Sequence, residues 1–179
     1  MRLELLSAHR HLITKIASLL HEEWGSLLPW ASLSNIEDRF VALTDTETDT
    51  FTLVALSGES EFLGTASVKL YELGDHPDKK HWLGEVFIPR SLRGQGIGSS
   101  LIRECLFRSA NIGVNILFLY TPDQQALYER FGWKEIESTT VNGETVSIMA
   151  CNTDRAQNPS GTSLSASPLI QTMSGTNTL

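Results

Sequence analysis

The stretch that decides the fold runs from Val86 to Ile102 and reads VFIPRSLRGQGIGSSLI. An apolar segment with strand character comes first, then a short turn, then a loop that contains Gly94, Gly96 and Gly98, and then a helix. Glycine lets the backbone curl and lets another molecule approach it closely. The first N–H groups of a helix have no intrahelical partners and lie at the positive end of its dipole. The stretch therefore predicts a binding site for phosphate oxygens.

Length and composition allow one ordinary domain with a hydrophobic core. The chain has 179 residues, of which 41% are hydrophobic and 20% are charged, and its net charge is -7. An acidic surface disfavours nucleic acid and more easily accommodates a cationic substrate such as an amine. No apolar run approaches the roughly 20 residues that span a bilayer, and only two cysteines occur. We therefore expect no nucleic-acid or membrane partner and a cytoplasmic location.

Residues 1–150 predict a mixed α/β order of elements. Ser7 is expected to cap the first helix, Ser34 with Glu37 to form a capping box on the second, and Asn142-Gly143 to turn a hairpin. The expected helices cover 7–24, 34–43, 95–110 and 123–131, and the expected strands cover 1–6, 51–56, 62–70, 82–88, 115–120, 133–139 and 145–150.

The composition changes at Asn152. Residues 152–179 are mostly Ser, Thr, Asn, Gly and Pro, with scattered single apolar positions. Such a segment buries too little apolar area to offset the entropy of ordering it. We therefore expect one domain over residues 1–151 and a disordered tail over residues 152–179.

Two common phosphate-binding loops do not fit the glycine pattern. A P-loop ends in Gly-Lys-Ser/Thr, whereas Gly98 is followed by Ser99-Ser100. A dinucleotide fingerprint has G-x-G-x-x-G near the start of a parallel sheet, whereas this loop has G-x-G-x-G after strands that are expected to be antiparallel. A flexible surface turn also remains open on the glycines alone.

Two motifs resemble those of the GNAT superfamily of acetyl-CoA-dependent N-acetyltransferases. The segment from Arg93 to Gly98 reads RGQGIG and matches that family's pattern Q/R-x-x-G-x-G/A. The segment from Thr121 to Trp133 reads TPDQQALYERFGW and looks like its short helix ending in Tyr-x-x-Phe-Gly-Trp/Phe. The resemblance implies an α/β (α+β) fold with a mixed, mostly antiparallel sheet, a central splay and about four flanking helices.

The resemblance also implies how acetyl-CoA is held. The backbone N–H groups expected to cradle its diphosphate belong to Arg93, Gly94, Gln95, Gly96, Ile97, Gly98 and Ser99. The Arg93 side chain either adds a charge-assisted contact or is a solvated surface arginine. The pantetheine arm is expected between strands 83–88 and 116–120, bonded by the backbone of Val86 and Ile88. The N–H of Phe87 is then expected to face the thioester oxygen.

Two side chains are expected to move protons. By resemblance Tyr128 protonates the leaving thiolate, and the alternative is a tyrosine that packs beside Phe131 and Trp133. Glu85 is a carboxylate in an otherwise apolar strand. If it points into the cleft, desolvation raises its pKa and improves it as a base for the amine, and if it points outward it is an ordinary edge carboxylate.

The acceptor pocket is expected to be formed by the loop between the first two helices and by the final hairpin. Trp24, Leu27, Leu28 and Trp30 cluster there, either as pocket wall or as a satellite core cluster. His76 and His81 flank a polar loop without metal-ligand spacing, so no metal is expected.

Taken together, the residues and the resemblance predict transfer of the acetyl group of acetyl-CoA to a primary amine. The acceptor is a small-molecule or peptide amine, with a lean to a cationic small molecule. Alternatives are a non-catalytic acyl-CoA-binding module on the same fold and a protein N-terminal or lysine acetyltransferase. The chain is expected to be a monomer or a homodimer.

Overall fold

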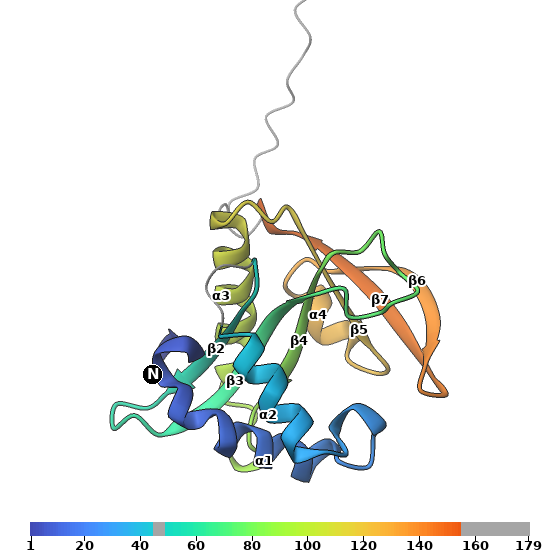
Figure 1. Cartoon of the computed structure of the whole chain (residues 1–179). Helices are drawn as coiled ribbons and strands as arrows, with labels where there is room; N and C mark the ends of the chain where they lie inside the picture. Colours follow the sequence, from blue (N-terminus) through green and yellow to red (C-terminus); the bar gives the residue numbers. More distant parts are fainter. Residues whose placement is uncertain (45–48, 155–179) are drawn as a thin grey trace, which may run out of the picture.

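A computed structural model describes residues 1–44 and 49–154 (Figure 1). The strands are β1 (Arg2–Leu5), β2 (Phe51–Leu56), β3 (Phe62–Leu70), β4 (His81–Phe87), β5 (Ile116–Thr121), β6 (Lys134–Val141) and β7 (Glu144–Asn152). The α-helices are α1 (Ile13–Trp24), α2 (Leu33–Ala42), α3 (Ile97–Asn111) and α4 (Gln125–Glu129). Short 3-10 segments are η1 (Leu6–Leu12), η2 (Leu28–Trp30) and η3 (Arg90–Leu92).

The strands form one 7-stranded sheet in the order β1-β2-β3-β4-β5-β7-β6. Every neighbouring pair is antiparallel except β4 and β5. This mixed, mostly antiparallel sheet with four α-helices confirms the predicted fold class. None of the helices in the described ranges combines the length and the apolar character that crossing a bilayer requires.

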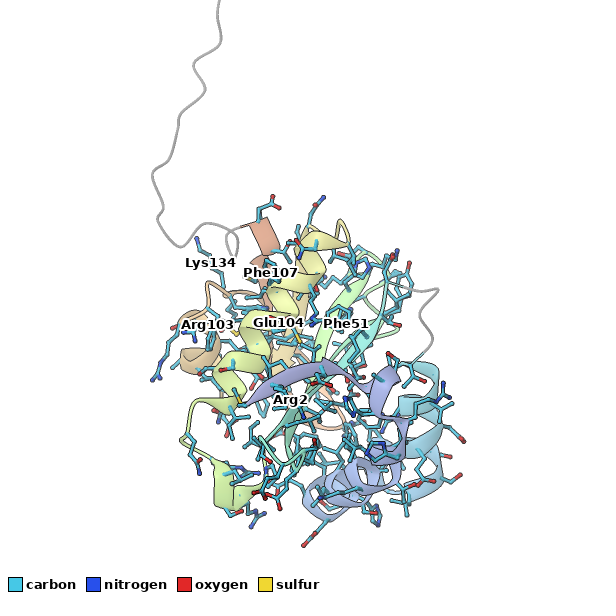
Figure 2. The ribbon with its side chains drawn as sticks, turned by 90° about the vertical axis from the view of Figure 1, so that its left-hand side faces the viewer. Arg2, Phe51, Arg103, Glu104, Phe107 and Lys134 are labelled. Atoms are coloured by element: carbon cyan, nitrogen blue, oxygen red, sulfur yellow. The ribbon has the colours of Figure 1, made fainter. Side chains whose placement is uncertain are left out.

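Helices cover both faces of the sheet, with α3 on one side and α1 and α2 on the other (Figure 1). The α3 side of the core includes Leu101, Ile102, Leu53, Ala66 and Leu117. The side under α1 and α2 includes Ile16, Leu20, Phe40, Val54 and Phe87. Figure 2 shows Arg103, Glu104 and Phe107 on the side of α3 that faces away from the sheet.

The sheet splits in its middle, between β4 and β5. Their parallel pairing is reduced to one position, where Trp82 lies opposite Phe118. Trp82 is fully buried, and its ring centre is 5.7 Å from that of Phe118 and 6.4 Å from that of Tyr120. The Trp82 indole N–H donates to the carbonyl oxygen of Lys79 at 2.7 Å. The predicted central splay is therefore present and begins just beyond this tryptophan.

A β-bulge lies in β4 on the open side of this split. Glu85 and Val86 together lie opposite the single residue Ala66 of β3. Glu85 has φ of 48°, in the left-handed region that non-glycine residues rarely adopt. A bulge leaves a residue unpaired and changes the direction of its side chain. The bulge thus decides where the Glu85 carboxylate points.

Both predicted serine caps are wrong. Ser7 lies inside η1, and the backbone leaves helical angles at His9. Helix α1 begins after Leu12 without a side-chain cap. Helix α2 is capped by Ser32, whose Oγ accepts from the N–H of Asn35 at 3.4 Å, and not by Ser34.

The described chain stays packed in the fold for two residues beyond residue 151. β7 continues through Asn152, and Thr153 is fully buried, with its Oγ1 donating to the Val114 carbonyl oxygen at 2.5 Å. The rest of the expected tail, from residue 155, lies outside the described residues.

The predicted hairpin turn at Asn142-Gly143 is confirmed, with φ of 51° and 83°.

Gly64→Ala should lower the free energy of unfolding by about 1–3 kcal/mol. A Cβ there would clash with the Ile88 side chain and lie 2.9 Å from the Phe87 carbonyl oxygen, which is backbone and cannot move aside alone. Gly58→Ala is the matched control, because a Cβ at Gly58 meets no atom within 4 Å. Urea unfolding measures both, and equal midpoints for the two variants would contradict close packing at Gly64.

Candidate active site

The loop before α3 has free hydrogen-bond donors. Gly94 and Gly96 have φ of 78° and 81°, a region that favours glycine, and Gly96 is the N-cap residue of α3. Within residues 1–44 and 49–154, the backbone N–H groups of residues 94–99 donate no hydrogen bond. Nothing lies within 4 Å of a Cβ built on Gly94 or Gly96. These N–H groups lie at the positive end of a helix, an arrangement that suits an anion.

The Arg93 side chain makes two hydrogen bonds within the protein. Its Nε donates to the Ile88 carbonyl oxygen at 2.9 Å, and its Nη2 lies 2.9 Å from Oε1 of Glu23. The other oxygen of Glu23 accepts from Nε of Arg90 at 3.1 Å. The hydrogen bond from Arg93, followed by that from Arg90, holds the pKa of Glu23 below its ordinary value despite some burial.

One N–H group of the predicted cradle already donates a hydrogen bond within the protein. The N–H of Arg93 donates to the Arg90 carbonyl oxygen at 3.3 Å, which leaves the N–H groups from Gly94 to Ser99. The Arg93 side chain is not simply a solvated arginine, because it ties the loop to the end of α1 through Glu23. Its direct contact with a phosphate stays a prediction.

The split between β4 and β5 opens into a cleft of about 380 Å³. Its lining comes from both halves of the sheet, from the segment between α1 and α2, and from the β6–β7 hairpin. The lining residues include Trp24, Leu27, Trp30, Lys69, Glu72, Glu85, Val86, Tyr120, Asp123, Tyr128, Asn142 and Glu144. The fold thus brings together Glu85 and Tyr128, assigned to proton transfer, with Trp24, Leu27 and Trp30 of the expected acceptor pocket. Leu28, which was expected in the same cluster, is 83% exposed and lies outside the lining.

Glu85 points into this cleft, which decides between its two predicted orientations. Its side chain is 2% exposed, and Oε1 lies 2.6 Å from Nζ of Lys69 on β3. Oε2 is buried and has no hydrogen-bond partner among the described residues. Buried polar atoms nearly always have a partner, so an unpaired carboxylate oxygen in a cleft indicates a place for a ligand donor.

Lys69 is a functional candidate that the sequence analysis missed. Its ammonium lies between Glu85, at 2.6 Å, and Glu72, at 2.7 Å. Burial lowers the pKa of Lys69, but the carboxylates of Glu85 and Glu72 outweigh it and raise the pKa above its ordinary value. A Cβ at Gly84 would lie 2.6 Å from Cε of Lys69, so glycine there leaves room for the lysine. A charged residue within the apolar run Phe62–Leu70 was the available signal.

Tyr128 lies on α4 and lines the cleft. Its ring packs edge-on against Trp133, with centres 5.8 Å apart. Burial raises the pKa of its phenol to about 12. The side chain therefore both packs beside Trp133 and faces the cleft, and the phenol keeps its proton at neutral pH.

The side chains before the loop are buried or partly buried. Phe87 is 4% exposed and packs against Trp24, with ring centres 5.9 Å apart. The Ile88 side chain packs into the α3 side of the core, and Val86 lines the cleft. The backbone role toward the acyl arm that the sequence analysis gave to these residues stays a prediction.

The sequence profile of the Acetyltransferase (GNAT) family matches residues 13–133. The chain belongs to this family. No curated protein matches this GNAT chain in sequence.

Solved structures share the fold of this GNAT protein. A chimera of the spermidine N-acetyltransferase SpeG from Vibrio cholerae and hSSAT is 18% identical, with a TM-score of 0.67, covering 88% of this chain and 99% of that chain. An aminoglycoside 6'-acetyltransferase type Ii is 17% identical, with a TM-score of 0.68 and coverage of 86% and 97%.

A further structure is that of an aminoglycoside 6'-N-acetyltransferase complexed with coenzyme A. It is 15% identical, with a TM-score of 0.66, and covers 86% of this chain and 97% of that one. At such identities the likeness establishes the shared fold alone.

Lys69→Met should lower the free energy of unfolding by about 3–5 kcal/mol, because it leaves the buried Glu85 carboxylate without its counter-ion. Lys80→Met is the matched control. Lys80 pairs with Asp49 at 3.1 Å, but the two side chains are 45% and 51% exposed, so stability should change little. Chemical denaturation measures both, and similar stabilities would show that the buried pair contributes nothing.

Tyr128→Phe should flatten the pH dependence of stability in alkali. The folded pKa of about 12 lies above the ordinary 10.0, so the folded state favours the neutral phenol. This stabilisation is complete below pH 10 and is lost as the pH rises to about 12. Unfolding free energies across that window should fall less steeply in Tyr128→Phe than in wild type. Tyr71→Phe, at a position 53% exposed, should keep the wild-type slope, and identical slopes in all three proteins would refute burial of the Tyr128 phenol.

Proposed function

We propose that this GNAT protein is an N-acetyltransferase that moves the acetyl group of acetyl-CoA to a primary amine. The observation that carries the proposal is the split between β4 and β5. Free N–H groups before α3 follow β4 along the chain. An unpaired carboxylate oxygen of Glu85 and the protonated phenol of Tyr128 line the gap.

The loop residues fit the diphosphate of coenzyme A. The N–H groups from Gly94 to Ser99 form a row of donors, and the room above Gly94 and Gly96 lets oxygens approach the backbone. Acetyl-CoA, when bound, supplies the acetyl group in activated form as a thioester. The backbone of Val86 and Ile88 would hold the pantetheine arm, and the N–H of Phe87 would stabilise negative charge on the carbonyl oxygen.

Glu85 is the proposed base. Oε1 is held by Lys69, so Oε2 is the oxygen free to accept a proton from the acceptor amine. The neutral nitrogen then attacks the acyl carbon and the bond from that carbon to sulfur breaks. The second proton of the nitrogen passes to the departing thiolate, which leaves as the thiol of coenzyme A. Tyr128 would donate a hydrogen bond to the departing sulfur. A phenol pKa of about 12 lies above the value of about 8.5 for a thiol, so donation without complete transfer is the favoured role.

An enzyme explains the cleft better than a non-catalytic acyl-CoA-binding module. A binding module needs the loop but has no use for a buried, unpaired carboxylate oxygen beside the open strand. The acidic side chains of Glu72, Asp123 and Glu144 in the lining favour a cationic small molecule over other acceptors. The solved structures of a spermidine and an aminoglycoside acetyltransferase, which share the fold, support small amines as a class.

Tyr128→Phe should lower kcat for thiol release by about 100-fold, because the sulfur loses its donor. The assay follows thiol release from acetyl-CoA with a panel of primary amines. Tyr71→Phe, exposed and outside the cleft lining, is the control and should keep wild-type kcat. Equal rates in wild type and Tyr128→Phe would remove Tyr128 from the reaction, and tight acetyl-CoA binding without turnover of any amine would favour the binding module.

Gly96→Val should weaken coenzyme A binding by at least about tenfold, because the side chain fills the space above the free N–H groups. Gly113→Val is the matched control. Gly113 also has φ of 81° and open space at its Cβ, so valine meets the same unfavourable φ there, but Gly113 lies beyond the other end of α3. Titration calorimetry with coenzyme A compares the two, and equal losses of affinity would attribute the effect to strain alone.

A further inference from the structure

We infer that the acceptor is a monoamine whose ammonium group is joined by a short linker to an apolar, preferably aromatic, body. This inference rests on the proposed function and specifies its acceptor. It sets the protein apart from acetyltransferases that act on amines carrying several charges. The cleft's wall and floor differ in their chemistry, and each favours a different part of such a molecule.

One wall of the cleft is apolar. Trp24, Leu27, Pro29 and Trp30, from the end of α1 and the segment before α2, all line it. The rings of Trp24 and Trp30 are 5.0 Å apart between centres, and Leu27 is 44% exposed although it faces the cleft. An exposed apolar wall in a concave site is stabilised when an apolar group covers it.

The tryptophan wall is poorly suited to bind a second ammonium. The guanidinium carbon of Arg39 already lies 4.3 Å from the centre of the Trp30 ring. Arg39 is held there by a hydrogen bond to the Pro29 carbonyl oxygen at 2.9 Å. This cation uses the attraction that the ring offers to positive charge, and it repels another cation placed close by. The wall therefore favours an uncharged body.

The floor of the cleft accommodates one positive charge. Lys69, Glu72 and Glu85 form one cluster with two carboxylates and one ammonium. Within the described part of the chain, the one buried oxygen of this cluster without a partner is Oε2 of Glu85. One amine nitrogen satisfies that oxygen, and Lys69 repels any further ammonium from the floor. Tyr120, whose pKa burial raises, also lines the cleft and adds no charge.

The remaining acids of the lining lie at the rim. Asp123 and Glu144 are exposed, and neither forms an ion pair with a residue in the described ranges. Exposed charges attract a cation from solution but are screened by water and salt. They therefore favour the approach of a cationic amine without selecting how many charges it carries. The number of charges on the amine is instead selected by the tryptophan wall and by the cluster of Lys69, Glu72 and Glu85.

The test compares kcat/KM for three probe amines by thiol release from acetyl-CoA: 2-phenylethylamine, spermidine and an aminoglycoside. We expect kcat/KM for 2-phenylethylamine to be at least about tenfold higher than for spermidine or for the aminoglycoside, which both carry several charges. Higher kcat/KM for spermidine or the aminoglycoside would overturn it while leaving the proposed function intact. No turnover of any amine, with coenzyme A still bound, would instead contradict the proposed function.

A pair of neighbouring leucines separates wall contact from general effects. Leu27→Ala should lower kcat/KM for 2-phenylethylamine by about fivefold and leave that for a small hydroxylated amine such as ethanolamine within about twofold. Leu28, 83% exposed and outside the lining, is the matched control, and Leu28→Ala should leave both values unchanged. Equal effects of the two substitutions, or an equal loss for both amines, would refute the apolar wall as a specificity determinant.

Discussion

The structure depends on one constraint: the parallel strands β4 and β5 are joined at Trp82 and Phe118 and nowhere else along their length. Trp82 is fully buried and anchored through its indole N–H, so the point where the strands part is fixed. Backbone groups that a continuous sheet would pair are left facing a cleft. An added extended chain suits such an edge, and this is the physical basis for the proposal that the cleft receives an acyl arm.

The bulge in β4 and the buried ion pair act together on this edge. The positive φ of Glu85 turns its carboxylate into the cleft, and Lys69 holds one oxygen at 2.6 Å. Glycine at position 84 leaves space for the lysine, so three residues from two adjacent strands determine the place of a single oxygen. A strained and buried arrangement of this kind lowers stability, and such arrangements are typical of functional sites.

The sequence was most informative where local chemistry dictates local structure. The glycines before α3, the Asn142-Gly143 turn and the run Phe62–Leu70 each predicted their element, because backbone angles or apolar periodicity act within a few residues. The serine caps were mispredicted because Ser7 and Ser34 have as much capping chemistry as Ser32, and only the packed helices decide among them. Lys69 could not be placed, since its partners Glu72 and Glu85 meet it only through strand pairing and the bulge.

The most direct measurement is amide hydrogen exchange with and without coenzyme A. The N–H groups from Gly94 to Ser99 have no acceptors within residues 1–44 and 49–154, so they should exchange rapidly in the free protein. Saturating coenzyme A should slow exchange at residues 94–99 and at 86–88, along the open edge of β4. Binding that leaves both segments unprotected, or protects a different face of the sheet, would contradict a ligand held between the diverging strands.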